Sequence, residues 1–253
     1  MKAFILCGGN GTRLDGEGKI KPKALVKIGN KPILIHLINS LIKNDIKEFV
    51  LCLGYKKKKI IDYFLSKYKI LFKNNVSNKY QIISLKLFNQ TVVIHFVDTE
   101  KDSGTGGRIK IANKIIKNKY AFLMTYCDGL ANINISNLIK LYKKKKKLVA
   151  LTAVQPQHRY GVIKINKSIV TSMNNNNPKQ NIWINGGYFL INPLALKLIK
   201  NKNTFWEQEP LNKLIKSKNL VSYIHKGFWE SMDTQKDKIK LNNIWKKNKN
   251  AWL

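Results

Sequence analysis

The segment that most constrains the fold is a glycine-rich stretch directly after a short apolar run near the N-terminus. The run Lys2–Leu6 predicts a buried first strand. It continues as Leu6-Cys7-Gly8-Gly9-Asn10-Gly11-Thr12-Arg13. Glycines at 8, 9 and 11 permit a sharp turn whose amides converge on anionic oxygens, and the Arg13 guanidinium can bind phosphate oxygens in pairs. The segment favours a phosphate-binding loop over the alternative, a plain glycine turn between strand and helix.

The spacing of the loop separates it from two familiar phosphate-binding motifs. A dinucleotide-binding fingerprint would need its third glycine where Arg13 stands. A Walker motif would need Gly-Lys-Ser/Thr after the loop, and the sequence has none there. Neither motif is therefore predicted.

Length and cysteine content bound the class of protein. The chain has 253 residues, enough for one large α/β domain with a sizeable core. No apolar stretch approaches the ~18–20 residues of a membrane span, and the apolar N-terminal run is too short for a signal peptide. Cys7, Cys52 and Cys127 are odd in number and far apart, which predicts reduced thiols in a cytoplasmic protein, without disulfides or a zinc site.

The formal net charge of +33 suggests a nucleic-acid partner, but the composition argues against one. Only three of the 47 basic residues are arginine, and the excess of Lys, Asn and Ile is what an AT-rich genome encodes wherever the fold permits. The lysine runs at 56–59 and 143–147 are interpreted as solvated helix ends. No nucleic acid or membrane partner is predicted.

The apolar pattern predicts alternating strands and helices. Strands are expected at 2–6, 47–53, 92–97, 121–126 and 148–154, with helices at 33–42, 57–69, 106–117 and 135–147 between them. Residues 71–90 look irregular and weakly β, with a hairpin excursion as one interpretation. Beyond residue 154 the alternation weakens into further strands at 160–165, 169–173, 183–191 and 221–225. The prediction is one α/β domain with a Rossmann-like, mostly parallel sheet flanked by helices and a small C-terminal β-containing part.

Two further segments offer candidate anion contacts. Ser103-Gly104-Thr105-Gly106-Gly107-Arg108 enters a helix whose free N–H groups and dipole favour an anion or a polar ligand edge. Arg108 either reads a base or a phosphate there or is an exposed arginine at a helix start. Pro22 keeps Lys21 extended, so Lys23 lies in a loop, where it either folds over the same anion as Arg13 or is a surface lysine.

Two aspartates are candidate metal ligands. Asp128 follows the predicted central strand, at the sheet edge where α/β proteins place their chemistry, and beside a triphosphate its natural role is to bind Mg²⁺. The alternatives are a turn-forming Asp128 and a helix-capping Asp233. No Ser-His-Asp or Cys-His set is apparent, so the inventory suits phosphoryl or nucleotidyl transfer.

Over nearly its whole length the chain resembles the sugar-phosphate nucleotidyltransferases. The matching segments are Leu6 to Leu14, Lys21-Pro22-Lys23, Gly29-Asn30-Lys31-Pro32-Ile33-Leu34, Thr105-Gly106-Gly107-Arg108, Tyr126-Cys127-Asp128-Gly129, Asn185-Gly186-Gly187, Trp206-Glu207-Gln208-Glu209-Pro210-Leu211 and Gly227-Phe228-Trp229 through Met232-Asp233-Thr234. The glycine loop marks the superfamily. The Thr-Gly-Gly-Arg, Trp-Glu-Gln-Glu-Pro-Leu and Gly-Phe-Trp…Met-Asp-Thr segments are similar to the cytidylyl branch.

The resemblance implies a set of site residues. Leu6, Cys7, Gly8, Gly9, Asn10, Gly11, Thr12, Arg13, Lys23, Ser103, Arg108 and Cys127 would bind the nucleotide, and Asp128 and Asp233 would bind Mg²⁺. Asn185, Gly186 and Gly187 would lie by the sugar phosphate, and Arg13, Lys23 and Asp128 would serve catalysis. Residues 1–154 would form the nucleotide-binding core and 155–253 the part with the sugar site and the second metal ligand.

The implied reaction joins CTP and α-D-glucose 1-phosphate into CDP-glucose and pyrophosphate, for polysaccharide synthesis, in a homo-oligomer. The alternatives are another sugar 1-phosphate or nucleotide, and a non-catalytic homologue that binds a nucleotide sugar.

The sequence departs from the family pattern at two places. Cys127 replaces a glycine before the metal-binding aspartate, and Asn175-Asn176-Asn177 replaces a Glu-Lys-Pro whose lysine binds the sugar phosphate. A neutral Asn removes a charge-assisted contact of roughly 1.5–3 kcal/mol. Lys179 either substitutes for that lysine, or the acceptor is another sugar phosphate or the activity is weak.

Overall fold

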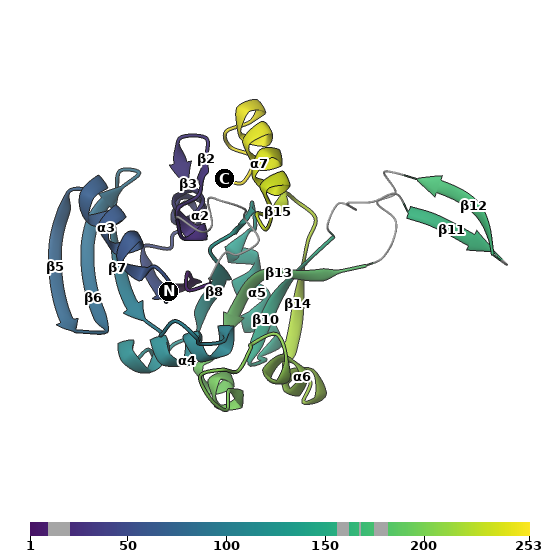
Figure 1. The fold of residues 1–253 in the computed structure, drawn as a ribbon. Helices are drawn as coiled ribbons and strands as arrows, with labels where there is room; N and C mark the ends of the chain where they lie inside the picture. Colours follow the sequence, from purple (N-terminus) through teal and green to yellow (C-terminus); the bar gives the residue numbers. More distant parts are fainter. Residues whose placement is uncertain (10–20, 156–161, 167, 175–181) are drawn as a thin grey trace.

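The computed structural model describes residues 1–9, 21–155, 162–166, 168–174 and 182–253, and its centre is a nine-stranded sheet (Figure 1). The strand order is β14-β10-β13-β8-β1-β4-β7-β6-β5. In chain order these strands are β1 (Lys2–Leu6), β4 (Glu48–Leu53), β5 (Ile70–Ser77), β6 (Tyr80–Leu87), β7 (Gln90–Asp98), β8 (Phe122–Tyr126), β10 (Val149–Val154), β13 (Ile184–Ile191) and β14 (Leu220–His225).

The middle of the sheet is parallel, which fixes where the site lies. β8, β1, β4 and β7 are neighbours and run in the same direction. Leu6 at the end of β1 is level with Cys52 of β4 and Tyr126 of β8. The loops that follow these three strands therefore open at one edge of the sheet, where open α/β sheets bind ligands.

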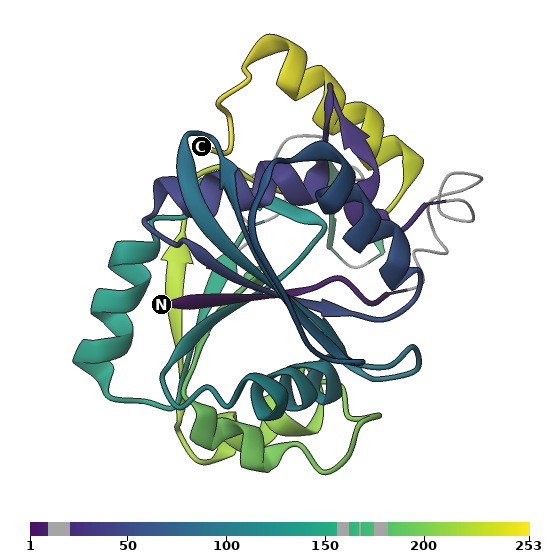
Figure 2. The ribbon, with the colours of Figure 1, turned by 90° about the vertical axis from the view of Figure 1, so that its left-hand side faces the viewer.

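Helices cover both faces of the sheet (Figure 2). One apolar core takes side chains from α2 (Ile33–Lys43), α3 (Lys57–Lys67), α5 (Ile135–Lys145) and α7 (Gln235–Lys247). The other takes side chains from α4 (Thr105–Ile116), the 3-10 helix η2 (Pro193–Leu198) and α6 (Glu209–Lys216). The central strands are near-continuous apolar runs because both of their faces are buried.

Short elements complete the described part of the chain. They are the 3-10 turn η1 (Lys23–Leu25) and the two-stranded pairs β2 (Lys27–Ile28) with β3 (Lys31–Pro32), β9 (Gly129–Ala131) with β15 (Trp229–Ser231), and β11 (Val162–Asn166) with β12 (Ile169–Asn174). Among the described residues, no helix is both long and apolar enough to cross a membrane.

The predicted fold class is confirmed, with one correction in the details. β6 and β13 run against the other strands of a sheet that is otherwise parallel in direction. The hairpin considered for 71–90 is confirmed, because β5 and β6 pair antiparallel, with two register shifts between them, and extend the sheet beyond β7. The proposed division of the chain at residue 154 stays a prediction. β10 and β13, which lie on either side of residue 154, are paired in one sheet.

Candidate active site

A cleft of about 370 Å³ opens where β1 and β8 end. It is lined by Leu6, Cys7, Gly8, Gly9, Lys23, Ala24, Ser103, Thr105, Arg108, Tyr126, Cys127, Asp128, Phe205 and Asp233. Segments far apart in the sequence therefore meet here, including the start of the glycine loop, the 103–108 segment and both candidate metal-binding aspartates.

Lys23 joins the two aspartates in this cleft. Its Nζ lies 2.6 Å from Asp128 Oδ2 and 2.9 Å from Asp233 Oδ1. Its side chain is only 13% exposed. Lys23 is thus part of the cleft, and the surface-lysine alternative is wrong.

Local structure holds these three side chains in place. Lys23 begins η1 after Pro22, and the next residue, Ala24, is buried in the core. β9 follows Asp128 and pairs with β15, so that the amide of Met232 donates to the carbonyl of Asp128 (2.9 Å) and Asp233 comes beside it. The side chain of Thr234 caps α7, so the capping role considered for Asp233 falls to its neighbour.

The two carboxylates form a cation site. Burial alone would lower the pKa of Lys23, but Asp128 and Asp233 outweigh it and raise the pKa, so the ammonium stays charged. Two carboxylates that converge on one cation fit a Mg²⁺ ion that takes its remaining ligands from water and substrate phosphates. Within the described ranges, no group of three or more His, Cys, Asp or Glu side chains forms a site held by protein ligands alone.

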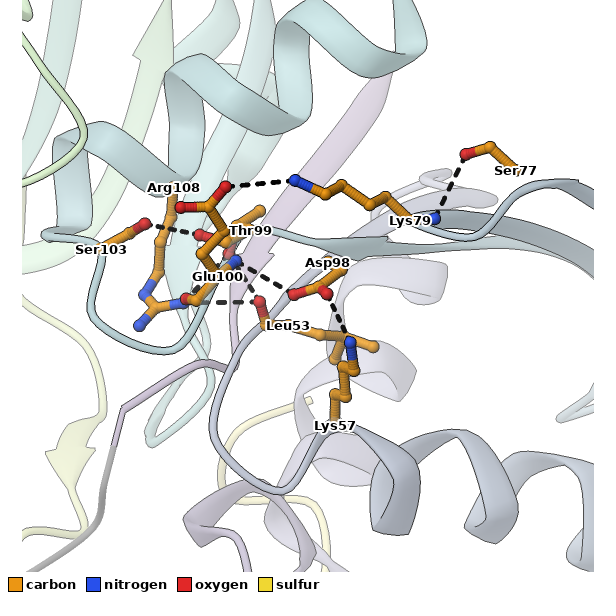
Figure 3. A network of polar contacts seen from close by, with 9 residues as sticks. All are labelled: Leu53, Lys57, Ser77, Lys79, Asp98, Thr99, Glu100, Ser103 and Arg108. Carbon is orange, nitrogen blue, oxygen red and sulfur yellow. Dashed lines mark hydrogen bonds and ion pairs between the residues drawn. The ribbon is translucent and has the colours of Figure 1, made fainter.

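Arg108 is buried beside the cleft and binds the loop that precedes α4 (Figure 3). Its guanidinium donates to the carbonyls of Glu100 and Lys101, both at 2.7 Å, and to Thr99 Oγ1 at 3.0 Å. Ser103 Oγ donates to the carbonyl of Thr99 (2.6 Å). The alternative of an exposed arginine at a helix start is therefore wrong.

Gly8 is required by the position of Arg108. A Cβ atom on Gly8 would lie 2.1 Å from Arg108 Nη1, far closer than atoms approach. The first glycine of the loop is thus explained by close packing as well as by the turn. Gly9 is exposed, with open space where a Cβ would be.

The start of α4 differs from the expectation of free amides. The amides of Gly104 and Gly107 donate to the carbonyls of Lys202 (2.8 Å) and Thr204 (3.1 Å). A Cβ on Gly107 would lie 1.8 Å from the carbonyl oxygen of Lys202. These glycines let a distant backbone segment pack on the helix start, and two of the amides expected to bind a ligand are already bonded.

The thiol of Cys7, which lines the cleft, remains protonated. Burial, followed by the neighbouring thiol of Cys127, raises the pKa of Cys7 well above its ordinary value. Cys7, Cys52 and Cys127 are all buried free thiols. A buried thiol that resists ionisation is a poor nucleophile, which argues against Cys7 as a nucleophile.

The residues expected near the sugar lie beside the cleft rather than in its lining. Asn185 is exposed and hydrogen-bonds to Tyr126, and Gly187 has a φ of +81° with Tyr126 packed against it. Trp229 Nε1 donates to the carbonyl of Gly186 (2.8 Å). Burial, and then the Glu207 carboxylate, raise the pKa of Tyr126, so its hydroxyl remains a donor.

Some predicted residues lie outside the described part of the chain, and some cleft residues were not predicted. The predicted residues outside the described part are Asn10, Gly11, Thr12, Arg13, Lys179 and Asn175-Asn176-Asn177. The cleft residues to which no role was assigned from the sequence are Thr105, Tyr126, Ala24 and Phe205. Thr105 and Tyr126 stand inside matching motif segments, and Phe205 directly precedes one, so adjacency to a motif was the available signal.

A second hollow, of about 400 Å³, lies between β5, β6 and the start of α3. Its two lysines already contact carboxylates, Lys57 that of Asp98 and Lys79 that of Glu100 (3.2 Å). Gly8 and Gly9 at the start of the glycine loop and both candidate metal ligands line the other cleft, which is therefore the candidate active site.

Comparison with known proteins places this geometry in a family. The nucleotidyl transferase family model matches residues 2–247. The chain belongs to the nucleotidyl transferase family. It is 40% identical to glucose-1-phosphate cytidylyltransferase of Salmonella typhimurium, over 100% of this chain and 98% of the relative. It is 36% identical to the probable glucose-1-phosphate cytidylyltransferase of Bacillus subtilis, over 100% and 99%.

Solved structures agree at the level of the fold. HddC from Yersinia pseudotuberculosis, complexed with GMP-PN, matches with a TM-score of 0.70 and 22% identity over 96% of this chain and 99% of that one. The protein is thus a nucleotidyltransferase with the fold of nucleotide-diphospho-sugar transferases. Its cleft lies at the end of β1, the strand that leads into the glycine loop.

Proposed function

We propose that this nucleotidyltransferase transfers the cytidylyl group of CTP to glucose 1-phosphate, giving CDP-glucose and pyrophosphate. Two full-length relatives carry this activity in their names. The observation that carries the proposal is the contact of Lys23 with both Asp128 and Asp233 in the cleft at the end of β1. A cation and two carboxylates there suit a triphosphate and its metal ion.

The proposed reaction is a direct displacement. An oxygen of the sugar phosphate bonds to the α-phosphorus of CTP, while the bond from that phosphorus to the leaving pyrophosphate breaks. A phosphate monoester loses its second proton with a pKa of about 6, so the nucleophile is ionised near neutral pH and needs no general base. In keeping with this, the described residues that line the cleft include neither histidine nor glutamate.

Asp128 and Asp233 are the proposed Mg²⁺ ligands. The ion, when bound, would neutralise charge on the phosphates of CTP. Lys23 would exchange the two carboxylates for phosphate oxygens and stabilise the charge that develops on them. Arg13, which lies outside the described residues, is proposed to bind the same phosphates.

The remaining predicted residues surround the two substrates. The backbone from Leu6 to Gly11, with Thr12, would hold the nucleotide, and Ser103, Arg108 and Cys127 would border it. Asn185, Gly186 and Gly187 would lie by the sugar, with Lys179 in place of the family lysine. We also infer a cytoplasmic homo-oligomer whose product serves polysaccharide synthesis.

Pyrophosphate release tests the proposal. Purified protein is assayed with Mg²⁺ and glucose 1-phosphate against CTP, UTP, dTTP and GTP in turn, with Asp128→Ala as control. Release with CTP alone, lost in the control, is expected. Equal or faster release with another nucleotide would contradict the cytidylyl assignment. Release from CTP with a different sugar 1-phosphate only would contradict the acceptor.

A further inference from the structure

The segment Trp206-Glu207-Gln208-Glu209-Pro210-Leu211 marks the cytidylyl branch, yet no role in the reaction has been assigned to it. We infer that Glu207 is a positioning residue that fixes the nucleotide side of the cleft, at the start of α4, relative to the sugar side, at the end of β8. It does so by bonding Thr105 and Tyr126 at once. This inference rests on the proposed function for the identity of the two substrates.

The carboxylate of Glu207 accepts two hydrogen bonds from side chains of the cleft. Thr105 Oγ1 donates to Oε2 at 2.5 Å, and the hydroxyl of Tyr126 donates to Oε1. Thr105 and Tyr126 both line the cleft, whereas Glu207 is exposed and is not among the lining residues. Glu207 therefore acts on the substrates through these two residues.

The bond to Thr105 fixes the start of α4. Thr105 is the first residue of the helix, and its N-cap residue Gly104 has no side chain to bond the free amides. Thr105 Oγ1 also accepts from the amide of Trp206 (2.9 Å), whose side chain is fully buried. The negative charge of Glu207 beside this N-terminus is favoured by the helix dipole. Arg108 lies on the same turn of α4, so its position depends on this anchor.

The bond to Tyr126 fixes the other side of the cleft. Tyr126 ends β8, directly before Cys127 and Asp128. It also hydrogen-bonds to Asn185 of β13, the strand proposed to lie by the sugar. Glu207 thus connects α4 on the nucleotide side with β8 and β13 on the sugar side.

The choice of a carboxylate suits this role and not a direct contact with phosphate. The cleft already holds the carboxylates of Asp128 and Asp233, and a further negative charge there with no cation beside it would repel both substrates. Beside Thr105 and Tyr126 it accepts from two hydroxyl groups, and bonds to a charged acceptor are about twice as strong as neutral ones. An amide at this position is neutral and replaces one acceptor oxygen by a donor, so both hydroxyl groups lose their bond to a charged acceptor.

The test is Glu207→Gln in the full chain, with CTP affinity measured by calorimetry and both KM values by pyrophosphate release. Loss of the charged anchor predicts that the Kd for CTP and the KM for each substrate rise about tenfold, with kcat changed less than about threefold, because alignment in the ground state is lost. Glu207→Gln combined with Tyr126→Phe should raise these constants much less than the product of the two single effects, since both changes act on the same hydrogen bond between Tyr126 and Glu207.

Glu209→Gln is the matched control. Glu209 stands in the same segment, but it pairs with Lys200 (2.8 Å) and Lys213 (3.0 Å), away from the cleft. Unchanged constants for Glu207→Gln, an equal loss for Glu209→Gln, or fully multiplicative effects with Tyr126→Phe would overturn the inference. If the wild-type protein binds CTP without turnover, the proposed function fails while the CTP affinities still decide the role of Glu207. Wild-type protein without CTP affinity would contradict both.

Discussion

Lys23 occupies the point on which Asp128 and Asp233 converge, and this has a consequence for metal binding. A protein ammonium and a metal ion compete for the same carboxylate oxygens. In the proposed reaction, substrate phosphates draw Lys23 away and the competition then favours the ion, so metal binding would be coupled to nucleotide binding. The single residue thus serves two states of the site.

Replacing Lys23 separates these two functions. Lys23→Met should lower kcat/KM by at least about 100-fold, the usual cost of losing one charged contact to a developing anion. The same change should increase the thermal stabilisation given by Mg²⁺ or Mn²⁺ without CTP, because the two carboxylates lose their ammonium. Enzyme kinetics and melting curves with and without metal measure both effects.

Lys27→Met is the matched control, since Lys27 is exposed and lies four residues on. It should leave both measurements unchanged. A Lys23→Met protein with near-normal kcat/KM, or with weaker metal stabilisation than the wild type, would contradict this account of the site.

His36 gives a prediction about pH. Its ring is buried, Nε2 lies 2.8 Å from the carbonyl of Ile28, and Trp252 stands edge-on to it at 5.3 Å. Burial lowers the pKa of His36 below its ordinary 6.5, although the backbone bond to Ile28 opposes this, and Lys31 lowers the pKa further. Between the lowered and the ordinary pKa the unfolded chain binds more protons, so stability falls as the pH falls through this range.

Urea unfolding at pH 7.5 and 5.5 measures the effect. His36→Gln keeps a donor for the carbonyl but cannot titrate, so it should lose about 1 kcal/mol less than the wild type over this interval. Part of the fall should persist, because burial also lowers the pKa of His95. An equal loss in the wild type and the variant would exclude this role for His36.

At the scale of elements, the loop between β7 and α4 depends on Arg108 (Figure 3). A lysine cannot reach Glu100 O, Lys101 O and Thr99 Oγ1 at the same time, because its donors share one nitrogen. Arg108→Lys should therefore lower the free energy of unfolding by about 2–3 kcal/mol in the absence of any ligand. Urea denaturation measures this directly.

Lys114→Arg, on the exposed face of the same helix, is the control and should change stability by less than about 0.5 kcal/mol. If Arg108→Lys unfolds like the wild type, Arg108 is a ligand contact only and the loop does not depend on it.

The elements also show what sequence reasoning could reach. β1, β4 and β8 are predicted because they are continuous apolar runs, which is how strands buried on both faces appear. β5 was predicted only as part of a weakly β segment, because nearly all of it is exposed and no alternation of apolar and polar residues marks it. The packing of Gly107 could not be predicted, because its partner Lys202 is distant in the sequence and contributes a backbone carbonyl, which carries no sequence signal.

At the scale of the molecule, the excess of lysine is accommodated at the surface. Lys57, Lys58 and Lys59 begin α3 and are exposed, and Lys143 and Lys144 are exposed in the last turn of α5. Both runs thus lie at helix ends, as expected, and the absence of a binding patch there stays a prediction. A net charge of +33 favours the approach of the anionic substrates proposed above.

The site and the fold were predictable to different depths. The family follows from short segments that keep their order over the whole chain, and Lys23, Asp128 and Asp233 within them meet in one cleft. Thr105 and Tyr126 were visible only as motif residues without a role. The hydrogen bonds that both make with Glu207 join segments about 80 to 100 residues apart, and motif spacing alone does not reveal such contacts.

The most direct test of the central claim is the rate of CDP-glucose formation from CTP and glucose 1-phosphate in Asp128→Asn and Asp62→Asn, beside the wild type. Both changes remove one carboxylate charge, but Asp62 is 54% exposed and pairs with Lys58 on α3, away from the cleft. We predict CDP-glucose formation at the wild-type rate in Asp62→Asn and a loss of at least about 100-fold in Asp128→Asn. Equal rates in the two variants, or no CDP-glucose from wild-type protein that binds CTP, would contradict the account.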